Sequence, residues 1–255
     1  MAEKTLRQRL LAPLRHRKVE QRRDKKFHYQ LRTLDEAAQR IVLRVRDYTL
    51  LNPEKLFAFI QATRYVARHH IEGAIVECGV WRGGAVMASA LTLLEEGERD
   101  RTFYLYDTFS GMSAPTERDF SLLKEEDAST TFEETRTGED SADWCRATLE
   151  DVRRNLATLP YDPARFVLVE GKVEDTIPGT LPERIAILRL DTDWYESTRH
   201  EMEHLMPRVV PRGVLIVDDY FRWAGNREAV DEYLSRAGIP ILLNKVGRSA
   251  IGVRP

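Results

Sequence analysis

The sequence has little cysteine, no long apolar run and almost no net charge. Its only two cysteines, Cys78 and Cys145, are too far apart in the chain for a metal-binding or redox motif. Their scarcity excludes a disulfide scaffold and fits the reducing cytoplasm, which is the location we expect. The mean hydropathy of −0.44, with no run near the roughly 18 apolar residues of a spanning helix, excludes a membrane-embedded protein. A net charge of −2 argues against a protein that binds polyanions with its whole surface.

Two common catalytic motifs are also missing. Neither the G-x-S-x-G nucleophile elbow nor the G-x-x-x-x-G-K-[ST] phosphate loop occurs, so hydrolase and P-loop activities lack their defining parts. The segment from His200 to His204 does match the H-E-x-x-H pattern of zinc proteases. No His or Cys follows His204 to complete a three-residue site. Because the segment also follows a parallel strand, we interpret it as a crossover helix that covers a sheet.

The 255 residues, 42% of them hydrophobic, suffice for one sizeable domain with an appendage. Residues 1–30 hold ten Lys and Arg against three acids, and leucines recur there at helical spacing. We predict a basic helical arm over residues 1–45, solvated or packed on another subunit of a homo-oligomer, and a main domain over residues 46–255. Basic arms also bind nucleic acid. Nucleic acid is not the partner we expect, because no aromatic residues alternate with these charges.

Short apolar runs alternate with amphipathic stretches along the chain. Runs that are apolar throughout, typical of strands buried on both faces, occupy 74–78, 102–107, 165–170, 185–191 and 213–219. Amphipathic stretches, typical of helices, occupy 34–49, 53–70, 84–96, 142–158, 195–207 and 226–237. Two further runs, 239–244 and 249–253, are too close together for a parallel crossover and predict a hairpin. The pattern predicts an α/β fold with a seven-stranded, mostly parallel sheet and one antiparallel strand.

One stretch does not fit this alternation. Residues 111–143 contain ten acidic and three basic residues, and they form a connection far longer than the roughly 2–6 residues usual between such elements. The stretch follows a predicted strand, so it lies above the carboxyl ends of the strands, where ligands bind in such sheets. We interpret it as a lid over a site. A surface elaboration is the alternative.

Glycines and an acid mark the ends of the first two predicted strands. The first strand leads into the turn Glu77–Gly84, whose three glycines are not spaced as a dinucleotide fingerprint. The second strand ends at Asp107. An acid at this position typically accepts hydrogen bonds from a ribose diol, and the alternative is that it caps a turn. Glycine turn and acid together favour a nucleoside-type ligand.

Four more carboxylates follow two neighbouring predicted strands, namely Asp191, Asp193, Asp218 and Asp219. Unpaired carboxylates in one cleft repel one another strongly. A hard divalent cation such as Mg²⁺, which prefers oxygen ligands, removes that repulsion. The alternative is that one or two of them cap helices, as Asp193 does if the next helix begins near Tyr195.

Five segments resemble the macrocin O-methyltransferase family, which includes magnesium-dependent sugar O-methyltransferases that use S-adenosylmethionine. The segments are VECGVWRGGAVM, LYDTFSGM, EGKVEDTIP, LRLDTDWYEST and VLIVDDY, within about residues 45–255. The resemblance implies a Rossmann-like class I methyltransferase fold whose closing hairpin supplies the antiparallel strand. It implies that the cofactor is bound by Thr49, Leu50, Glu77, Gly79, Asp107, Ser110, Val173, Asp175 and Asp191. It also implies Mg²⁺ ligands at Asp191, Asp218 and Asp219, with Asp193 as the general base.

The chemistry agrees with these implied roles. A bound Mg²⁺ lowers the pKa of a sugar hydroxyl, and Asp193 then takes its proton while the oxygen attacks the methyl group. Related catechol methyltransferases carry a lysine where this chain has Trp194, which favours an alkyl hydroxyl over a catechol. We expect an enzyme that methylates a sugar hydroxyl of a glycosylated natural product or glycan. The alternatives are a methyltransferase for a phenolic or other non-sugar hydroxyl, and a non-catalytic cofactor-binding protein that acts through its basic arm.

Overall fold

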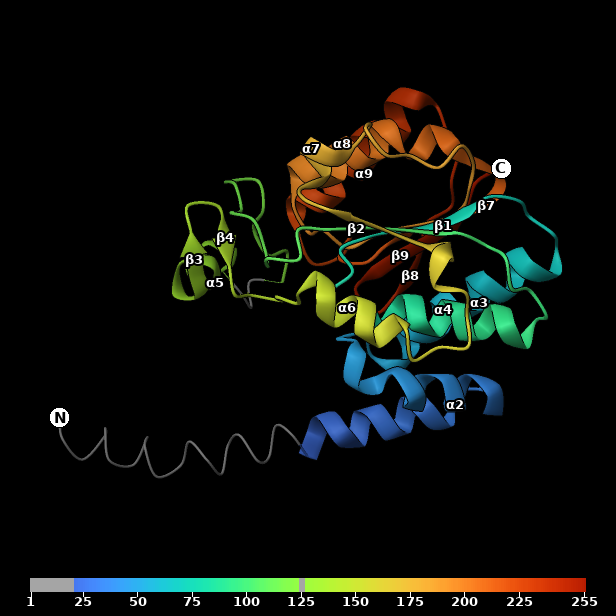
Figure 1. Ribbon diagram of the computed structural model, residues 1–255. Helices are drawn as coiled ribbons and strands as arrows, with labels where there is room; N and C mark the ends of the chain where they lie inside the picture. The colour runs from blue at the N-terminus through green and yellow to red at the C-terminus, as the bar shows by residue number, and fades with distance from the viewer. Residues whose placement is uncertain (1–20, 124–126) are drawn as a thin grey trace, which may run out of the picture.

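The computed structural model describes residues 21–123 and 127–255. A seven-stranded sheet in the order β5-β2-β1-β6-β7-β9-β8 forms its centre (Figure 1). Its strands are β1 Ala74–Cys78, β2 Phe103–Asp107, β5 Phe166–Glu170, β6 Ile185–Leu190, β7 Val209–Val217, β8 Asn244–Val246 and β9 Ser249–Val253. The first five pair in parallel, whereas β9 runs antiparallel to both of its neighbours. The predicted mostly parallel sheet with one antiparallel strand is confirmed.

Helices cover both faces of the sheet (Figure 1). One layer holds α2 Glu36–Val45, α3 Pro53–Arg68, α4 Gly84–Glu95 and α6 Leu149–Leu156, and the other holds α7 Val173–Thr176, α8 Tyr195–His204 and α9 Ala224–Ala237. The 3₁₀ helices are η1 Arg46–Tyr48, η2 Pro163–Arg165 and η3 Met206–Arg208. Neighbouring strand residues such as Ile75 and Val76 belong to separate buried clusters, which explains why the strand sequences are apolar throughout. Within the described ranges, no helix has the length and apolar character needed to cross a bilayer.

The strand order reverses between β1 and β6. From β1 the chain adds β2 and β5 on one side, and it then crosses to add β6 and β7 on the other. Gly79, which follows β1 with a φ of 83°, lets the ends of these two central strands come together. A Cβ on this residue would lie 2.2 Å from the carbonyl oxygen of Asp191. The carboxyl ends of β1 and β6 therefore meet at the point where such sheets bind ligands.

Part of the predicted basic arm packs on the main domain. Residues 21–32 are helical, and α2 follows with Asp35 as its N-cap, whose Oδ1 accepts the Ala38 N–H at 2.9 Å. The buried face of α2, including Ile41 and Val42, belongs to the same core cluster as α3 and α4. Residues 1–20 lie outside the described residues, and the boundary at residue 45 stays a prediction.

The closing hairpin is shifted from its predicted position. The strand expected over 239–244 is wrong, because the pairing begins only at Asn244. Pro240 has no N–H to donate to a strand ladder. The turn lies at Gly247, which has a φ of 62°, so the short strand β8 pairs back directly onto β9.

The insertion at 111–143 has secondary structure of its own. It contains α5 Ala128–Thr135 and a two-stranded ribbon made of β3 Arg136–Gly138 and β4 Ser141–Ala142, which lie together beside the sheet (Figure 1). The helix predicted over 142–158 is therefore wrong at its start, since Ala142 belongs to the ribbon. The helix α6 begins at Leu149, where the Thr148 hydroxyl accepts the Asp151 N–H at 3.1 Å.

Candidate active site

A cavity lies at the carboxyl ends of the parallel strands. Its wall is formed by the loops after β1, β2, β5, β6 and β7, by the segment before α3 and by part of the insertion. Of the residues predicted for the site, those in the wall are Thr49, Leu50, Glu77, Gly79, Asp107, Val173, Asp191, Asp193, Asp218 and Asp219. Ser110 and Asp175 are exposed and lie outside the wall. Their neighbours Thr108 and Glu174 line it instead.

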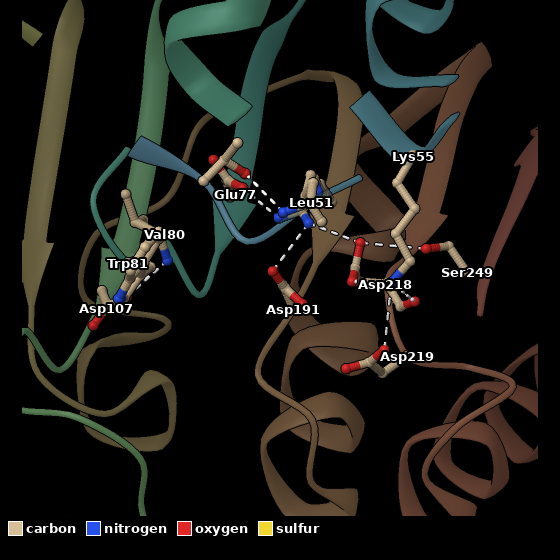
Figure 2. A network of polar contacts seen from close by, with 12 residues as sticks. Leu51, Lys55, Glu77, Val80, Trp81, Asp107, Asp191, Asp218, Asp219 and Ser249 are labelled. Atoms are coloured by element: carbon tan, nitrogen blue, oxygen red, sulfur yellow. Dashed lines mark hydrogen bonds and ion pairs between the residues drawn. The ribbon is translucent and has the colours of Figure 1, made fainter. Parts of the chain in front are cut away.

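Arg189 is the central cation of this site, although it stands in the buried strand β6. Its side chain is 2% exposed and donates to Glu77, to Asp191 Oδ2 at 2.9 Å and to Asp218 Oδ1 at 2.8 Å. Figure 2 shows these three carboxylates converging on one point. Because a buried charge needs partners, the guanidinium and the carboxylates compensate one another. Sequence analysis missed this residue, although a single arginine in an apolar run signals a paired buried charge.

Glu77, near the end of β1, has one carboxylate oxygen left for a ligand. The residue is 1% exposed, and its Oε1 accepts from Arg189. Burial raises the pKa of Glu77 to about 7, against the opposing effect of Arg189. Its Oε2 has no hydrogen-bond partner among the described residues. Since buried polar atoms are normally paired, this oxygen in the cavity wall is suited to accept a hydrogen bond from a bound ligand.

Asp107, at the end of β2, holds the turn that follows β1. Its Oδ2 accepts the N–H groups of Val80 at 2.7 Å and Trp81 at 3.0 Å, and its Oδ1 accepts the Phe109 N–H at 2.8 Å (Figure 2). Burial raises the pKa of Asp107, and these backbone hydrogen bonds oppose the shift. The carboxylate thus caps the turn while remaining in the cavity wall, and a carboxylate oxygen that accepts one bond can accept a second.

Three of the four clustered aspartates come close together. One carboxylate oxygen from each of Asp191, Asp193 and Asp219 lies within 4.8 Å of the others. Burial, followed by the negative charges of its neighbours, raises the pKa of Asp193 well above its usual value. Burial likewise raises the pKa of Asp191, and Arg189 opposes this shift. Asp191 is paired with Arg189, and Asp219 Oδ2 lies 3.1 Å from the Nη1 of Arg222. The Oδ1 of Asp193 has no partner among the described residues, so the group offers the oxygen donors of a cation site together with one unpaired carboxylate oxygen.

Asp218 lies apart from this group and is paired with cations of the protein. Lys55, in the first turn of α3, places its Nζ 2.6 Å from Asp218 Oδ2 and 3.5 Å from Asp219 Oδ1 (Figure 2). Burial tends to raise the pKa of Asp218, but Arg189 and Lys55 outweigh it and lower this pKa to about 2. Sequence analysis missed Lys55, and a lysine in the first turn of a helix carries no signal that would have identified it.

Tryptophan side chains pack the end of the insertion against the loops that follow β6 and β7. Trp144, which directly follows the insertion, packs edge-on against Trp194 and Trp223, which follow β6 and β7, with ring centroids 5.8 and 6.4 Å apart. The Trp194 Nε1 donates to the carbonyl oxygen of Ser113 at 3.0 Å. Ser113, Met112 and Cys145 lie in the cavity wall. The start of the insertion therefore lines the cavity, and its role as a lid stays a prediction.

The H-E-x-x-H segment lies on α8, the crossover helix expected there. The rings of His200 and His204 are tilted against each other with centroids 4.4 Å apart, and the His200 Nε2 lies 2.9 Å from the carbonyl oxygen of Ile177. Within residues 21–123 and 127–255, neither histidine belongs to a group of three ligands that could hold a metal.

Comparisons with known proteins find a family model, relatives and a solved structure that are named as O-methyltransferases. The model of the family described as Macrocin-O-methyltransferase (TylF) matches residues 1–254. Mycinamicin III 3''-O-methyltransferase of Micromonospora griseorubida is 32% identical over 206 residues, which cover 80% of this chain and 77% of that protein. The 8-demethyl-8-(2,3-dimethoxy-alpha-L-rhamnosyl)-tetracenomycin-C 4'-O-methyltransferase of Streptomyces olivaceus is 32% identical over 212 residues, or 80% and 74% of the two chains. The structure of the O-methyltransferase NovP matches with a TM-score of 0.71 at 28% identity, covering 81% of this chain and 82% of that one.

Proposed function

Because the chain belongs to the macrocin O-methyltransferase family, we propose that it transfers a methyl group from S-adenosylmethionine to a sugar hydroxyl of a glycosylated natural product, with the help of Mg²⁺. The observation that carries this proposal is that the clustered carboxylates of Asp191, Asp193 and Asp219 line the same cavity as Glu77 and Asp107. Named relatives act on mycinamicin III and on a rhamnosyl tetracenomycin, which supports a glycoside as the acceptor class.

The side chains that line the cavity are of the types that bind S-adenosylmethionine. The unpartnered Oε2 of Glu77 is suited to accept hydrogen bonds from the ammonium group of the methionine part. Asp107 stands where an acid accepts ribose hydroxyls. Leu50 lines the cavity with 68% of its surface exposed, so it has apolar surface that a bound cofactor would cover.

The carboxylates fit Mg²⁺ in donor type and charge. Asp191 and Asp219 belong both to the ligand set that the family resemblance implies and to the group of oxygens within 4.8 Å. We assign them as ligands, with Asp218 as the third. Asp218 would then exchange its Lys55 contact of 2.6 Å for the ion. Asp193 keeps an unpartnered oxygen and is assigned as the general base.

The reaction follows from these positions. S-adenosylmethionine supplies an electrophilic methyl group when bound, and Mg²⁺ lowers the pKa of a hydroxyl that it faces. Asp193 would accept the hydroxyl proton at its Oδ1 as the sugar oxygen bonds to the methyl carbon, while the bond from that carbon to the sulfonium sulfur breaks and S-adenosylhomocysteine leaves. Arg189 holds Asp191 and Glu77 in place. The insertion, fastened by Trp144, excludes water and completes the acceptor pocket.

Calorimetric titration with S-adenosylhomocysteine tests the cofactor site. We expect a dissociation constant on the order of micromolar for the unaltered chain. Leu50→Ala should weaken binding by about 3- to 10-fold, because it removes apolar contact surface. Leu242→Ala is the matched control, since Leu242 is 77% exposed and lies outside the cavity wall. The absence of binding to the unaltered chain, with and without Mg²⁺, would refute the proposal.

We further propose that the chain self-associates through its N-terminal helices. Tyr29 and Leu43 expose 74% and 51% of their surfaces there, and large exposed apolar side chains in one region favour a second copy as their cover. Light scattering should give a dimer or larger assembly that Tyr29→Lys with Leu43→Lys reduces to a monomer. A monomeric unaltered chain would refute this. The cytoplasmic location also stays a prediction.

A further inference from the structure

We propose that Asp119, in the acidic insertion, is a positioning residue that fixes the loop carrying Asp193 and so holds this side chain in its reacting position. The catalytic consequence rests on the proposed function, whereas the structural part does not. We name residues 119–122 the strap, because this segment bonds to both loops that carry the clustered aspartates.

Asp119 caps helix α8 from a distant part of the chain. The N-cap residue of α8, Trp194, makes no side-chain bond to the first N–H groups of the helix. Asp119 Oδ1 accepts the Tyr195 N–H at 2.7 Å, across 76 positions of sequence. Its other oxygen accepts the N–H and the hydroxyl of Thr116 at 2.8 and 2.7 Å. With 2% of its surface exposed, this carboxylate is fixed at the positive end of a helix dipole.

A glycine on α9 makes room for this carboxylate. A Cβ on residue 225 would lie 2.2 Å from Asp119 Oδ1 and 2.9 Å from the Cβ of Tyr195. Gly225 is in the first turn of α9, which begins at Ala224, so the carboxylate lies beside the N-termini of two helices. Glycine within a helix is normally unfavourable, and the close approach of Asp119 explains why it is present here.

The strap also holds the loop after β7, which carries the second pair of aspartates. The Ala224 N–H donates to the carbonyl oxygen of Phe120 at 3.0 Å, and the Leu122 N–H donates to that of Arg222 at 2.8 Å. A four-residue segment of the insertion thus joins the loop after β6 to the loop after β7. The carboxylates of the cation site come from these two loops, so the strap joins the two segments that set their spacing.

Asp193 needs such support because its backbone is strained. Its φ is 70°, and the Trp194 N–H donates across it to the carbonyl oxygen of Thr192 at 2.9 Å. This is a three-residue γ-turn of the rare, strained kind. Strained backbone persists only where its flanks are held. The pairing of β6 with β1 holds one flank, and the bond from Tyr195 to Asp119 holds the other.

Variants of the full chain test the role of the strap. Asp119→Ala removes the cap, and Gly225→Ala displaces the carboxylate while leaving it in the chain. Glu117→Ala is the matched control, because it removes an exposed acid of the same segment. One readout is hydrogen exchange in residues 192–198, with residues 84–95 as the internal reference. The second is methyl transfer to 4-nitrophenyl α-L-rhamnoside, with S-adenosylhomocysteine affinity measured by calorimetry.

Exchange in residues 192–198 should rise in Asp119→Ala and in Gly225→Ala, and it should stay unchanged in Glu117→Ala. The value of kcat should fall roughly 10- to 100-fold in both strap variants, since small misplacements of reacting groups have effects of this size. KM and the cofactor affinity should change less than about twofold. Asp119→Asn, which keeps an oxygen to accept the Tyr195 N–H, should restore part of kcat. In the double variant Asp119→Ala/Gly225→Ala, the losses of kcat should be less than additive, because alanine at residue 119 has no carboxylate oxygen for the added Cβ at residue 225 to displace.

Unchanged exchange in residues 192–198 of Asp119→Ala would overturn the inference. An equal loss of kcat in Glu117→Ala, or fully additive losses in the double variant, would overturn it as well. If the unaltered chain methylates no glycoside, the proposed function fails, and the exchange measurement still decides whether Asp119 holds the loop.

Discussion

Replacing Arg189 by methionine removes the buried cation that Glu77, Asp191 and Asp218 share. Methionine keeps a long, flexible side chain in the space but has no charge. Glu77 and Asp191 then lose their ion-pair partner, and Asp218 keeps only Lys55. Breaking a buried ion pair from one side typically costs about 3–5 kcal/mol, because an uncompensated charge stays buried. The total free energy of unfolding of a protein is about 5–15 kcal/mol, so we expect Arg189→Met to lose a large part of the stability.

The size of this loss should depend on pH. Without the guanidinium, the pKa values of Glu77 and Asp191 in the folded variant lie further above their values in the unfolded chain. The folded variant then binds more protons than the unfolded chain, so its stability falls as the pH rises. The deficit relative to the unaltered protein should therefore be greater at pH 8 than at pH 5.

Urea unfolding at these two pH values measures the effect. Arg184→Met is the control, because Arg184 is 53% exposed in its ion pair with Glu72, and exposed pairs contribute about 0–1 kcal/mol. Adding Glu77→Gln to Arg189→Met should recover part of the loss, since it removes one unpaired charge. A loss below about 1 kcal/mol at pH 8, equal to that of the control, would refute the reasoning that burial makes this ion network costly to break.

The remaining predictions concern the cation site and the N-cap of α2. Asp193→Asn should lower kcat at least about 100-fold, as loss of a general base does, while the Mg²⁺ affinity measured by calorimetry changes little. Asp218→Asn should weaken Mg²⁺ binding. If Asp193→Asn weakened Mg²⁺ binding and Asp218→Asn did not, Asp193 would be the ligand. Asp35→Ala should lower the free energy of unfolding by about 1–2 kcal/mol, because it removes the cap of α2 and a partner of Arg64. The Arg64 hydrogen bond lowers the pKa of Asp35. The loss of stability in Asp35→Ala should therefore be complete above a pH of about 4 and shrink as the pH falls further. A loss that stays constant from pH 7 to pH 2 in urea unfolding would contradict this prediction.

The strands and the acids at their ends could be predicted from sequence, because burial on both faces leaves a continuous apolar run and parallel strands end at one edge. The hairpin strand over 239–244 could not, since its apolar residues precede the pairing that begins at Asn244. The cations of the site were also missed. Arg189 was hidden within a strand that reads as apolar, and Lys55 reaches Asp218 from 163 positions away, a contact that only the folded chain creates.

The position of Asp119 also could not be predicted from the sequence. The insertion was recognised by its length and charge, but ten acids in one segment do not reveal which of them is buried. Asp119 is distinguished only by its long-range bond to Tyr195 and by the space beside Gly225. Local patterns therefore predicted the sheet and many of the residues that line the cavity, whereas contacts between distant segments required the structure.

Methyl transfer itself tests the central claim most directly. The chain is incubated with Mg²⁺, S-adenosylmethionine carrying an isotope-labelled methyl group, and a panel of 4-nitrophenyl glycosides and free phenols, and the products are followed by mass spectrometry. We predict that the label appears on a sugar oxygen of at least one glycoside, and that Asp193→Asn abolishes most of this transfer. Label on phenolic hydroxyls alone, with every sugar unlabelled, would contradict the account.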